Sequence, residues 1–125
     1  MKKIISTELA PEPIGPYNQA VAFGELLFVS GQIAIDNITG ELKIESLEEE
    51  THLVMKNLKE VLSAGGSDFD KVIKTSIFLS DMSFFPVVNK IYGSYFSSDF
   101  PARECVAVKT LPKSVNVEIS AIAHR

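Results

Sequence analysis

Between Ser46 and Gly66 the apolar side chains recur every three or four residues, which is the spacing of one face of an α-helix. Ser46 stands three residues before Glu49, as in a capping box, and the acidic residues at 48–50 suit the positive end of a helix dipole. Gly65 and Gly66 interrupt the pattern. We therefore predict a helix whose apolar stripe consists of Leu47, Val54, Leu58, Val61 and Leu62.

Short apolar runs on the N-terminal side of this helix are typical of strands. Pro11, Pro13 and Pro16 make the first segment extended or turn-like, so we expect it at the surface. The runs 19–23 and 26–30 then meet around a glycine and predict a β-hairpin. Residues 36–40 read as a second turn.

The C-terminal half alternates between strand and helix patterns. Val72–Ser80 predicts a strand with Ile73, Ile77 and Leu79 on one side and Lys74 and Ser76 on the other. A second helix follows, capped by Asp81 or Ser83, with Pro86 in its first turn and an apolar stripe of Phe85, Val88, Tyr92, Tyr95 and Phe96. Glu104–Thr110 and Val115–Ala123 complete the pattern as strands. The order predicts an α+β fold with two helices packed on one face of a mixed sheet.

The last two strands are predicted to pair as a hairpin whose tip is Pro112-Lys113. That register places Val108 opposite Val117 on the core face, and Glu104 faces the helices with them. Arg103, Cys105 and Ala107 then share the other face with Asn116, Glu118, Ser120 and Ile122.

Arg103 and Glu118 are the candidate chemical pair on that second face. In the predicted register their Cα atoms lie roughly 14 Å apart, from a rise of ~3.3 Å per residue and a strand spacing of ~4.8 Å. This leaves a gap the size of a small metabolite above Cys105 and Ser120. An arginine can bind a carboxylate through two hydrogen bonds, and a glutamate can accept a proton from water. The alternative is an arginine at the surface or in an oligomer contact and a glutamate on a solvent-facing strand.

Composition narrows the classes of function. The 125 residues suit one domain, and a net charge of −4 provides no basic field for nucleic acid. Cys105 is the single cysteine, which excludes an internal disulfide and a multi-cysteine metal site and favours a reducing compartment. His52 and His124 lack ligand spacing and are expected in solvent. No stretch has the length of a membrane span or a signal-peptide core, so we expect a cytoplasmic protein.

Several motifs in order resemble the RidA family of reactive-intermediate imine deaminases, over the whole chain. They are IGPYNQA at 14–20, VSGQIA at 29–34, Gly40, Asn57, the segment with Phe85, Asn89, Tyr92 and Phe96, FPARECV at 100–106 and LPKSVNVEISAIA at 111–123. Glu104 departs from the family, in which small residues are commoner at this position.

The resemblance implies a single domain over residues 1–125, with a chorismate-mutase-like fold that forms a homotrimer with sites between subunits. It implies that Arg103 binds the substrate carboxylate and that Glu118 positions the attacking water. The other implied pocket residues are Tyr17, Ser30, Gly31, Asn89 and Cys105. Taken without the resemblance, Tyr17 could simply anchor a loop, Ser30-Gly31 a turn, Asn89 a backbone group and Cys105 a small buried position.

The implied reaction is hydrolysis of 2-imino acids such as 2-iminobutanoate and 2-iminopropanoate to 2-oxo acids and ammonia, without metal or cofactor. Two other functions remain open. One is a regulatory module that binds 2-oxo acids or contacts partner proteins. The other, a ribonuclease or translation inhibitor, ranks last because of the acidic charge and the absence of a paired histidine or metal site.

Overall fold

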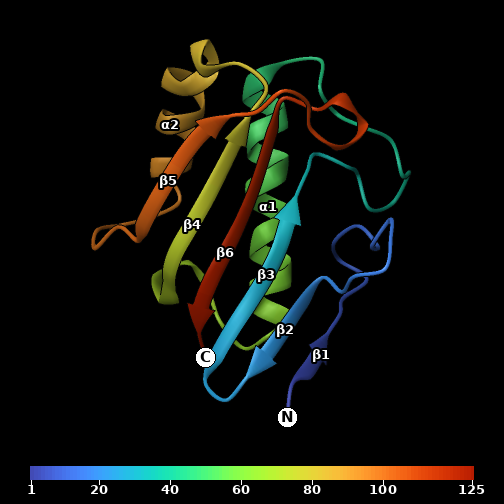
Figure 1. Ribbon diagram of the computed structural model, residues 1–125, viewed down its shortest axis with the longest axis vertical. Coiled ribbons are helices and arrows are strands. Elements are labelled where there is room, and N and C mark those ends of the chain that lie inside the picture. The colour runs from blue at the N-terminus through green and yellow to red at the C-terminus, as the bar shows by residue number, and fades with distance from the viewer.

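The computed structural model describes residues 1–125 as a six-stranded sheet with two α-helices on one face (Figure 1). The strands are β1 (Lys3–Ile5), β2 (Ala20–Phe23), β3 (Leu26–Gln32), β4 (Val72–Leu79), β5 (Ala102–Ala107) and β6 (Val117–His124). The helices are α1 (Leu47–Ala64) and α2 (Phe85–Gly93), with short 3₁₀ turns at Phe69–Lys71, Met82–Phe84 and Pro112–Ser114. The predicted α+β class is confirmed.

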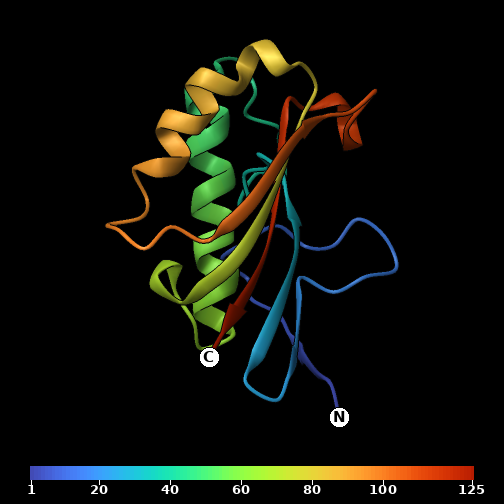
Figure 2. The same cartoon turned by 60° about the vertical axis from the view of Figure 1, so that its left-hand side comes forward.

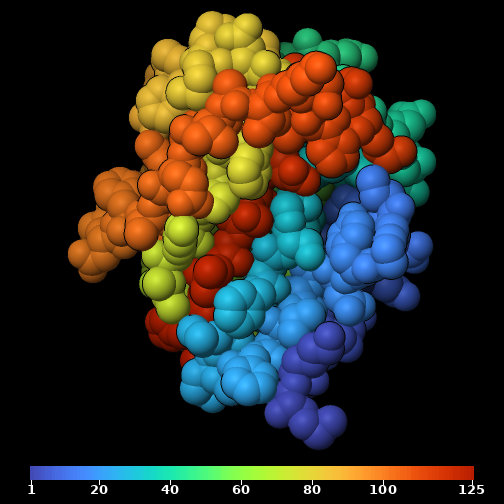
Figure 3. Space-filling view, viewed as in Figure 1, coloured from blue at the N-terminus to red at the C-terminus, as the bar shows by residue number.

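The strand order is β1-β2-β3-β6-β4-β5, and only the β4–β5 pair is parallel. Figure 2 shows both helices on the same side of the sheet, which leaves the other face without a helical layer. Figure 3 looks onto that uncovered face, where side chains of β3, β6 and β4 reach the surface. Phe28 and Val106, 43% and 44% exposed, belong to this open face. The open face is therefore partly apolar.

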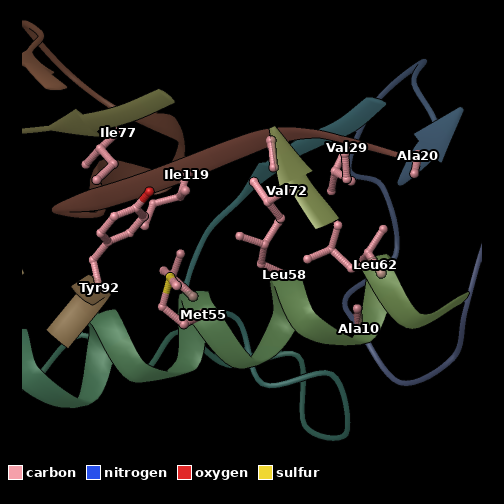
Figure 4. Close-up of a cluster of buried hydrophobic side chains, with 14 of the residues drawn as sticks. Ala10, Ala20, Val29, Met55, Leu58, Leu62, Val72, Ile77, Tyr92 and Ile119 are labelled. Atoms are coloured by element: carbon pink, nitrogen blue, oxygen red, sulfur yellow. The ribbon is translucent and has the colours of Figure 1, made fainter. Parts of the chain in front are cut away.

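The core lies between the sheet and α1. Met55, Leu58 and Leu62 point from α1 toward Val72, Ile77 and Ile119 of the sheet (Figure 4). The predicted cap is present, because the Ser46 hydroxyl accepts a hydrogen bond from the Glu49 amide at 3.0 Å. None of the helices combines the length and apolar character that crossing a bilayer requires.

The predicted local elements are largely confirmed. The β2–β3 hairpin turns at Gly24 with φ +59°, and the second turn closes through a bond from the Gly40 amide to the Asp36 carbonyl. Asp81 caps the 3₁₀ turn that leads into α2. Three details differ. β1 was not predicted, and α2 ends at Gly93, so Tyr95 and Phe96 of the predicted stripe lie beyond the helix. A bulge after Val72 also leaves Ile73 45% exposed while Thr75 is buried in line with Ile77.

The predicted hairpin between the last two strands is wrong. β4 lies between β5 and β6 in the sheet, so β5 and β6 do not pair. The segment that links β5 to β6 along the chain is a long connection rather than a two-residue turn. The burial patterns give the reason. From Thr75 onward in β4, and throughout β6, every second residue is buried, as suits central strands, whereas no residue of β5 is fully buried, as suits an edge.

This strand order changes the face of the sheet on which the candidate site residues lie. Arg103 is opposite Thr75 and Cys105 is opposite Ile77, so both lie on the helix side of the sheet. Glu118 is opposite Phe78, on the open face. Glu104 also lies on the open face, where it bonds to Ser76 and pairs with Lys74 at 3.0 Å. The predicted shared face for Arg103 and Glu118 is therefore wrong within one subunit.

Candidate active site

Arg103 is held in a defined position at the sheet edge although its residue is exposed. Its Nη1 donates to Asn89 Oδ1 at 2.7 Å, and its guanidinium carbon lies 5.2 Å from the centre of the Tyr92 ring and 5.5 Å from that of Phe85. Neither ion pair in the chain includes Arg103. An oriented guanidinium without an acidic partner is suited to bind an external anion.

The Tyr92 ring packs against the Arg103 guanidinium. Its hydroxyl makes a 2.7 Å hydrogen bond with the Thr75 hydroxyl, and both residues are buried. Burial raises the pKa of Tyr92 above its ordinary value, against the opposing effects of the Thr75 hydrogen bond and the Arg103 charge. The phenol is therefore neutral and acts as a rigid platform. A surface hollow at this place is lined by Asn89, Tyr92, Gly93, Phe100, Pro101 and Arg103.

A second hollow lies around Glu118 on the open face. It is lined by Ile14, Tyr17, Ser30, Gly31, Ile33, Pro112 and Glu118. Burial raises the pKa of the Glu118 carboxyl, and no cation or hydrogen bond offsets it. A carboxylate with a raised pKa is a stronger base than an exposed one, which suits proton transfer.

Gly31 allows this glutamate to lie where it does. A Cβ atom at residue 31 would come within 2.7 Å of Glu118 Oε2 and 2.8 Å of its carboxyl carbon. The β3–β6 register shifts between Val29 and Gln32, so a bulge brings residue 31 under the carboxylate. The glycine is thus required by close approach.

The predicted residues fall into two half-sites. Tyr17, Ser30, Gly31 and Glu118 share one hollow, while Asn89 and Arg103 share the other. Two strand spacings and three residues separate Arg103 from Glu118, roughly 14 Å between Cα atoms, and they lie on opposite faces. Cys105 lines neither hollow. It packs against the core, and burial raises the pKa of its thiol although Arg103 acts in the opposite direction.

Comparison with known proteins places this geometry in a family. Residues 7–125 match the family model described as Endoribonuclease L-PSP. The human 2-iminobutanoate/2-iminopropanoate deaminase is 44% identical over 123 residues, which are 98% of this chain and 90% of the human protein. RidA from a Psychrobacter species is 36% identical with a TM-score of 0.95, and the match covers 98% of this chain and 99% of the Psychrobacter chain. The chain belongs to the RidA family.

A third relative carries a ligand in its solved structure. TdcF of E. coli, described with bound serine, is 39% identical with a TM-score of 0.94, and the match covers 98% of both chains. The resemblance of the motifs to the RidA family is thus confirmed over nearly the whole chain. The individual roles of the site residues remain predictions.

The segment that carries Tyr17 is fastened by one buried side chain of this RidA-family protein. Gln19, 3% exposed, accepts from the Thr7 amide at 2.7 Å and donates to the carbonyls of Thr7, Ala10 and Pro11. The Tyr17 hydroxyl accepts from the Ile14 amide at 3.2 Å. Ser30 Oγ donates to the Asn18 carbonyl at 2.6 Å. No pattern in the sequence indicated this role of Gln19.

We expect Gln19→Ala to release this loop. Removing the side chain leaves several buried backbone groups without partners, which costs roughly 2–4 kcal/mol of unfolding free energy. Amide hydrogen exchange should accelerate at Thr7 and Ile14 while α1 remains protected. Asn37→Ala is the matched control, because Asn37 makes one exposed bond to the Glu8 carbonyl. Equal exchange rates in Gln19→Ala and wild type would contradict the assignment.

We expect Gly31→Ala to displace the Glu118 carboxylate and to lower the rate of the reaction proposed below by roughly 10- to 100-fold, because misplacement of a reacting group by about 1 Å has effects of this size. The measurement is kcat, together with a crystal structure of the variant. Gly15→Ala is the control, since its new methyl group would meet only Tyr17 at an ordinary 3.6 Å. A Gly31→Ala protein with wild-type kcat would show that the carboxylate position is unimportant.

Proposed function

We propose that this protein hydrolyses 2-imino acids, such as 2-iminobutanoate and 2-iminopropanoate, to 2-oxo acids and ammonia. The observation that carries the proposal is Arg103, a guanidinium oriented by Asn89 and two aromatic rings with no acidic partner in the chain. Such a group suits a small carboxylate. The activity named for the human relative and the serine bound to TdcF, an amino acid with a carboxylate, support this class of ligand.

The complete site is proposed to lie between subunits of a homotrimer. The two half-sites of one chain lie on opposite faces of the sheet, so one chain cannot place both around one small molecule. The open face carries exposed Phe28 and Val106, which favours its burial against other copies. A closed ring of three subunits covers every open face and can bring Arg103 of one copy beside Glu118 of the next.

The chemistry needs positioning and one proton acceptor. Arg103 holds the carboxylate of the substrate, which places the electrophilic imine carbon near the Glu118 hollow. Glu118 takes a proton from water as the oxygen bonds to that carbon and passes this proton to the imine nitrogen, which gives an amino alcohol and restores the carboxylate. Transfer of the hydroxyl proton to the nitrogen by way of Glu118 then breaks the C–N bond. The products are a 2-oxo acid and ammonia, and Glu118 returns to its carboxylate form.

Tyr17, Ser30, Gly31, Asn89 and Cys105 complete the proposed site in different ways. Asn89 orients the arginine, Gly31 makes room for the glutamate, and Tyr17 and Ser30 form the wall of the Glu118 hollow. Cys105, two residues beyond Arg103 and against the core, contributes bulk and backbone rather than a reactive thiol. The mechanism requires no metal ion or cofactor.

The experiment is a coupled assay in which a pyridoxal-phosphate-dependent threonine dehydratase generates 2-iminobutanoate. Catalytic amounts of the protein should shorten the lifetime of the imine and accelerate the appearance of 2-oxobutanoate. The regulatory alternative gives another result, namely binding of 2-oxobutanoate with no change in imine lifetime. Cleavage of RNA under the same conditions, without an effect on the imine, would favour the activity in the family description.

A further inference from the structure

Glu50 is a completely buried carboxylate to which the proposed mechanism gives no role. It lies in the first turn of α1 and is 0% exposed. Neither ion pair in the chain includes it. Burial of an unpaired charge is unfavourable unless hydrogen bonds compensate, so such a residue needs a specific reason.

The compensation comes from the residues immediately before Glu118. Glu50 Oε2 accepts from the backbone amides of Asn116 at 2.7 Å and Val117 at 3.1 Å. Glu50 Oε1 accepts from Asn116 Nδ2 at 2.7 Å. All three partners are donors, an arrangement that suits an ionised carboxylate, which only accepts. Asn116 Oδ1 in turn receives a bond from the Ser80 hydroxyl at 3.2 Å.

These bonds hold β6 where its pairing with β3 has ended. The last β3–β6 partners are Gln32 and Ile119, so Asn116 and Val117 have no partner on β3, and their amides bond to Glu50. Glu50 supplies the missing acceptors. Glu118, the next residue along the chain, lies against Gly31 with no spare space. A small shift at the start of β6 therefore moves the carboxylate away from its place.

We propose that Glu50 is a positioning residue that fixes the start of β6 and thereby holds the Glu118 carboxylate over Gly31. The catalytic part of this inference rests on the proposed role of Glu118, while the positional part depends only on the contacts of Glu50. Its effect reaches the substrate through Glu118, and Glu50 itself touches neither hollow.

The hydrogen-bond pattern provides a reciprocal-exchange test. In Asn116→Asp, a carboxylate replaces the amide donor and faces Glu50, so the two negative groups repel each other and the start of β6 shifts. In the double variant Glu50→Gln/Asn116→Asp, the glutamine carbonyl accepts both backbone amides and its amide donates to the new aspartate. Every bond of the network is then restored with amide and carboxylate exchanged. Glu50→Gln alone also retains the network if the Asn116 amide rotates and Ser80 accepts.

Asn116→Asp is expected to lower kcat roughly 10- to 100-fold with little change in KM, because the carboxylate-binding half-site is elsewhere. The double variant should restore kcat to within about threefold of wild type, and Glu50→Gln alone should keep it in that range, since the hydrogen bonds of both variants are complete. Leu62→Ala controls for general destabilisation, because Leu62 is buried near the far end of the same helix. If Leu62→Ala loses as much activity at an equal fall in Tm, or if the double variant is no better than Asn116→Asp, the positioning role is overturned.

A second readout separates this inference from the proposed function. Carbon-13 NMR titration of the Glu118 carboxyl requires no turnover. The raised pKa of Glu118 should fall toward its ordinary value in Asn116→Asp and recover in the double variant, because only the first displaces the carboxylate into solvent. An inactive wild type with this titration pattern refutes the imine reaction and retains the positioning role. An active wild type whose Glu118 titrates identically in all variants refutes the positioning role alone.

Discussion

Arg103→Ala is expected to reduce the acceleration of imine hydrolysis by at least roughly 100-fold, which corresponds to about 2.7 kcal/mol of lost transition-state binding. The guanidinium supplies the only charge in its half-site that can hold the substrate carboxylate. Without this clamp the imine carbon has no fixed position relative to the water. The measurement is kcat/KM in the coupled dehydratase assay, with binding of 2-oxobutanoate followed separately by calorimetry.

The fold should survive this substitution. Arg103 lies on the edge strand in an exposed position, and its side chain makes one hydrogen bond and two cation–π contacts. Arg103→Lys is the informative companion, because it keeps the charge but loses the planar fork and much of the stacking on Tyr92. We expect an intermediate rate for it. An alanine variant with the wild-type rate and an unchanged affinity for 2-oxobutanoate would eliminate the clamp.

Local patterns predicted the elements well but failed for the pairing of the last strands. The α1 cap, the β2–β3 hairpin and the position of α2 follow from residues close together in the sequence. The partner of β5 is β4, whose paired residues lie 28 positions away, as Thr75 and Arg103 do. A turn signal at Pro112-Lys113 cannot reveal such a partner. The side predicted for Glu104, a charged residue facing the helices, was the sign of a wrong register.

Arg103 and Glu118 were selected from the predicted register, and most of the other candidate site residues from the family motifs, whereas their division between two faces was not foreseen. It depends on which strand is central, and this is decided by burial over the whole sheet. The role of Glu50 was missed for a different reason. Glu50 was read as an acid that suits the helix dipole, yet it stands four residues before Val54 on the buried stripe. A charge at a stripe position requires a buried partner, and this signal could have identified the link to Asn116.

The histidines show how little a pattern says about local contacts. Both were expected in solvent, and both residues are exposed. His52 Nδ1 nevertheless makes a 2.6 Å hydrogen bond with the Tyr95 hydroxyl. That contact joins α1 to the segment after α2 and lies outside both hollows.

Glu118→Gln is expected to retain binding of 2-oxobutanoate and to lower kcat by roughly 100-fold or more, because an amide cannot take the proton from water. In the wild type, kcat should fall as the pH drops through the raised pKa of Glu118, since the protonated form is not a base. The variant should lack this acidic limb. A variant with a normal rate or an unchanged acidic limb would assign water activation to another group.

The same substitution should leave the protein equally or more stable at neutral pH. A carboxyl whose pKa is higher in the folded state binds its proton more tightly there, so stability declines as the pH rises from the unfolded toward the folded pKa. Glutamine has no charge to desolvate, so the part of the fall in stability with rising pH that residue 118 causes disappears in the variant. Thermal melts of wild type and variant between pH 4 and pH 8, values chosen to bracket a raised carboxyl pKa, measure the difference. A Tm well below wild type at neutral pH would indicate that Glu118 is structural.

Mixing the two inactive variants then tests whether each site is shared between subunits. A shared site needs Arg103 from one copy and Glu118 from a neighbour, so a trimer that contains both variants regenerates one complete site of its three. Random assembly from equal amounts makes about three quarters of the trimers mixed, and the expected activity is about a quarter of wild type. Sites contained within one subunit would give no recovery, because every chain would lack one of the two groups. Co-refolding followed by the coupled assay therefore tests the proposed arrangement independently of any single rate.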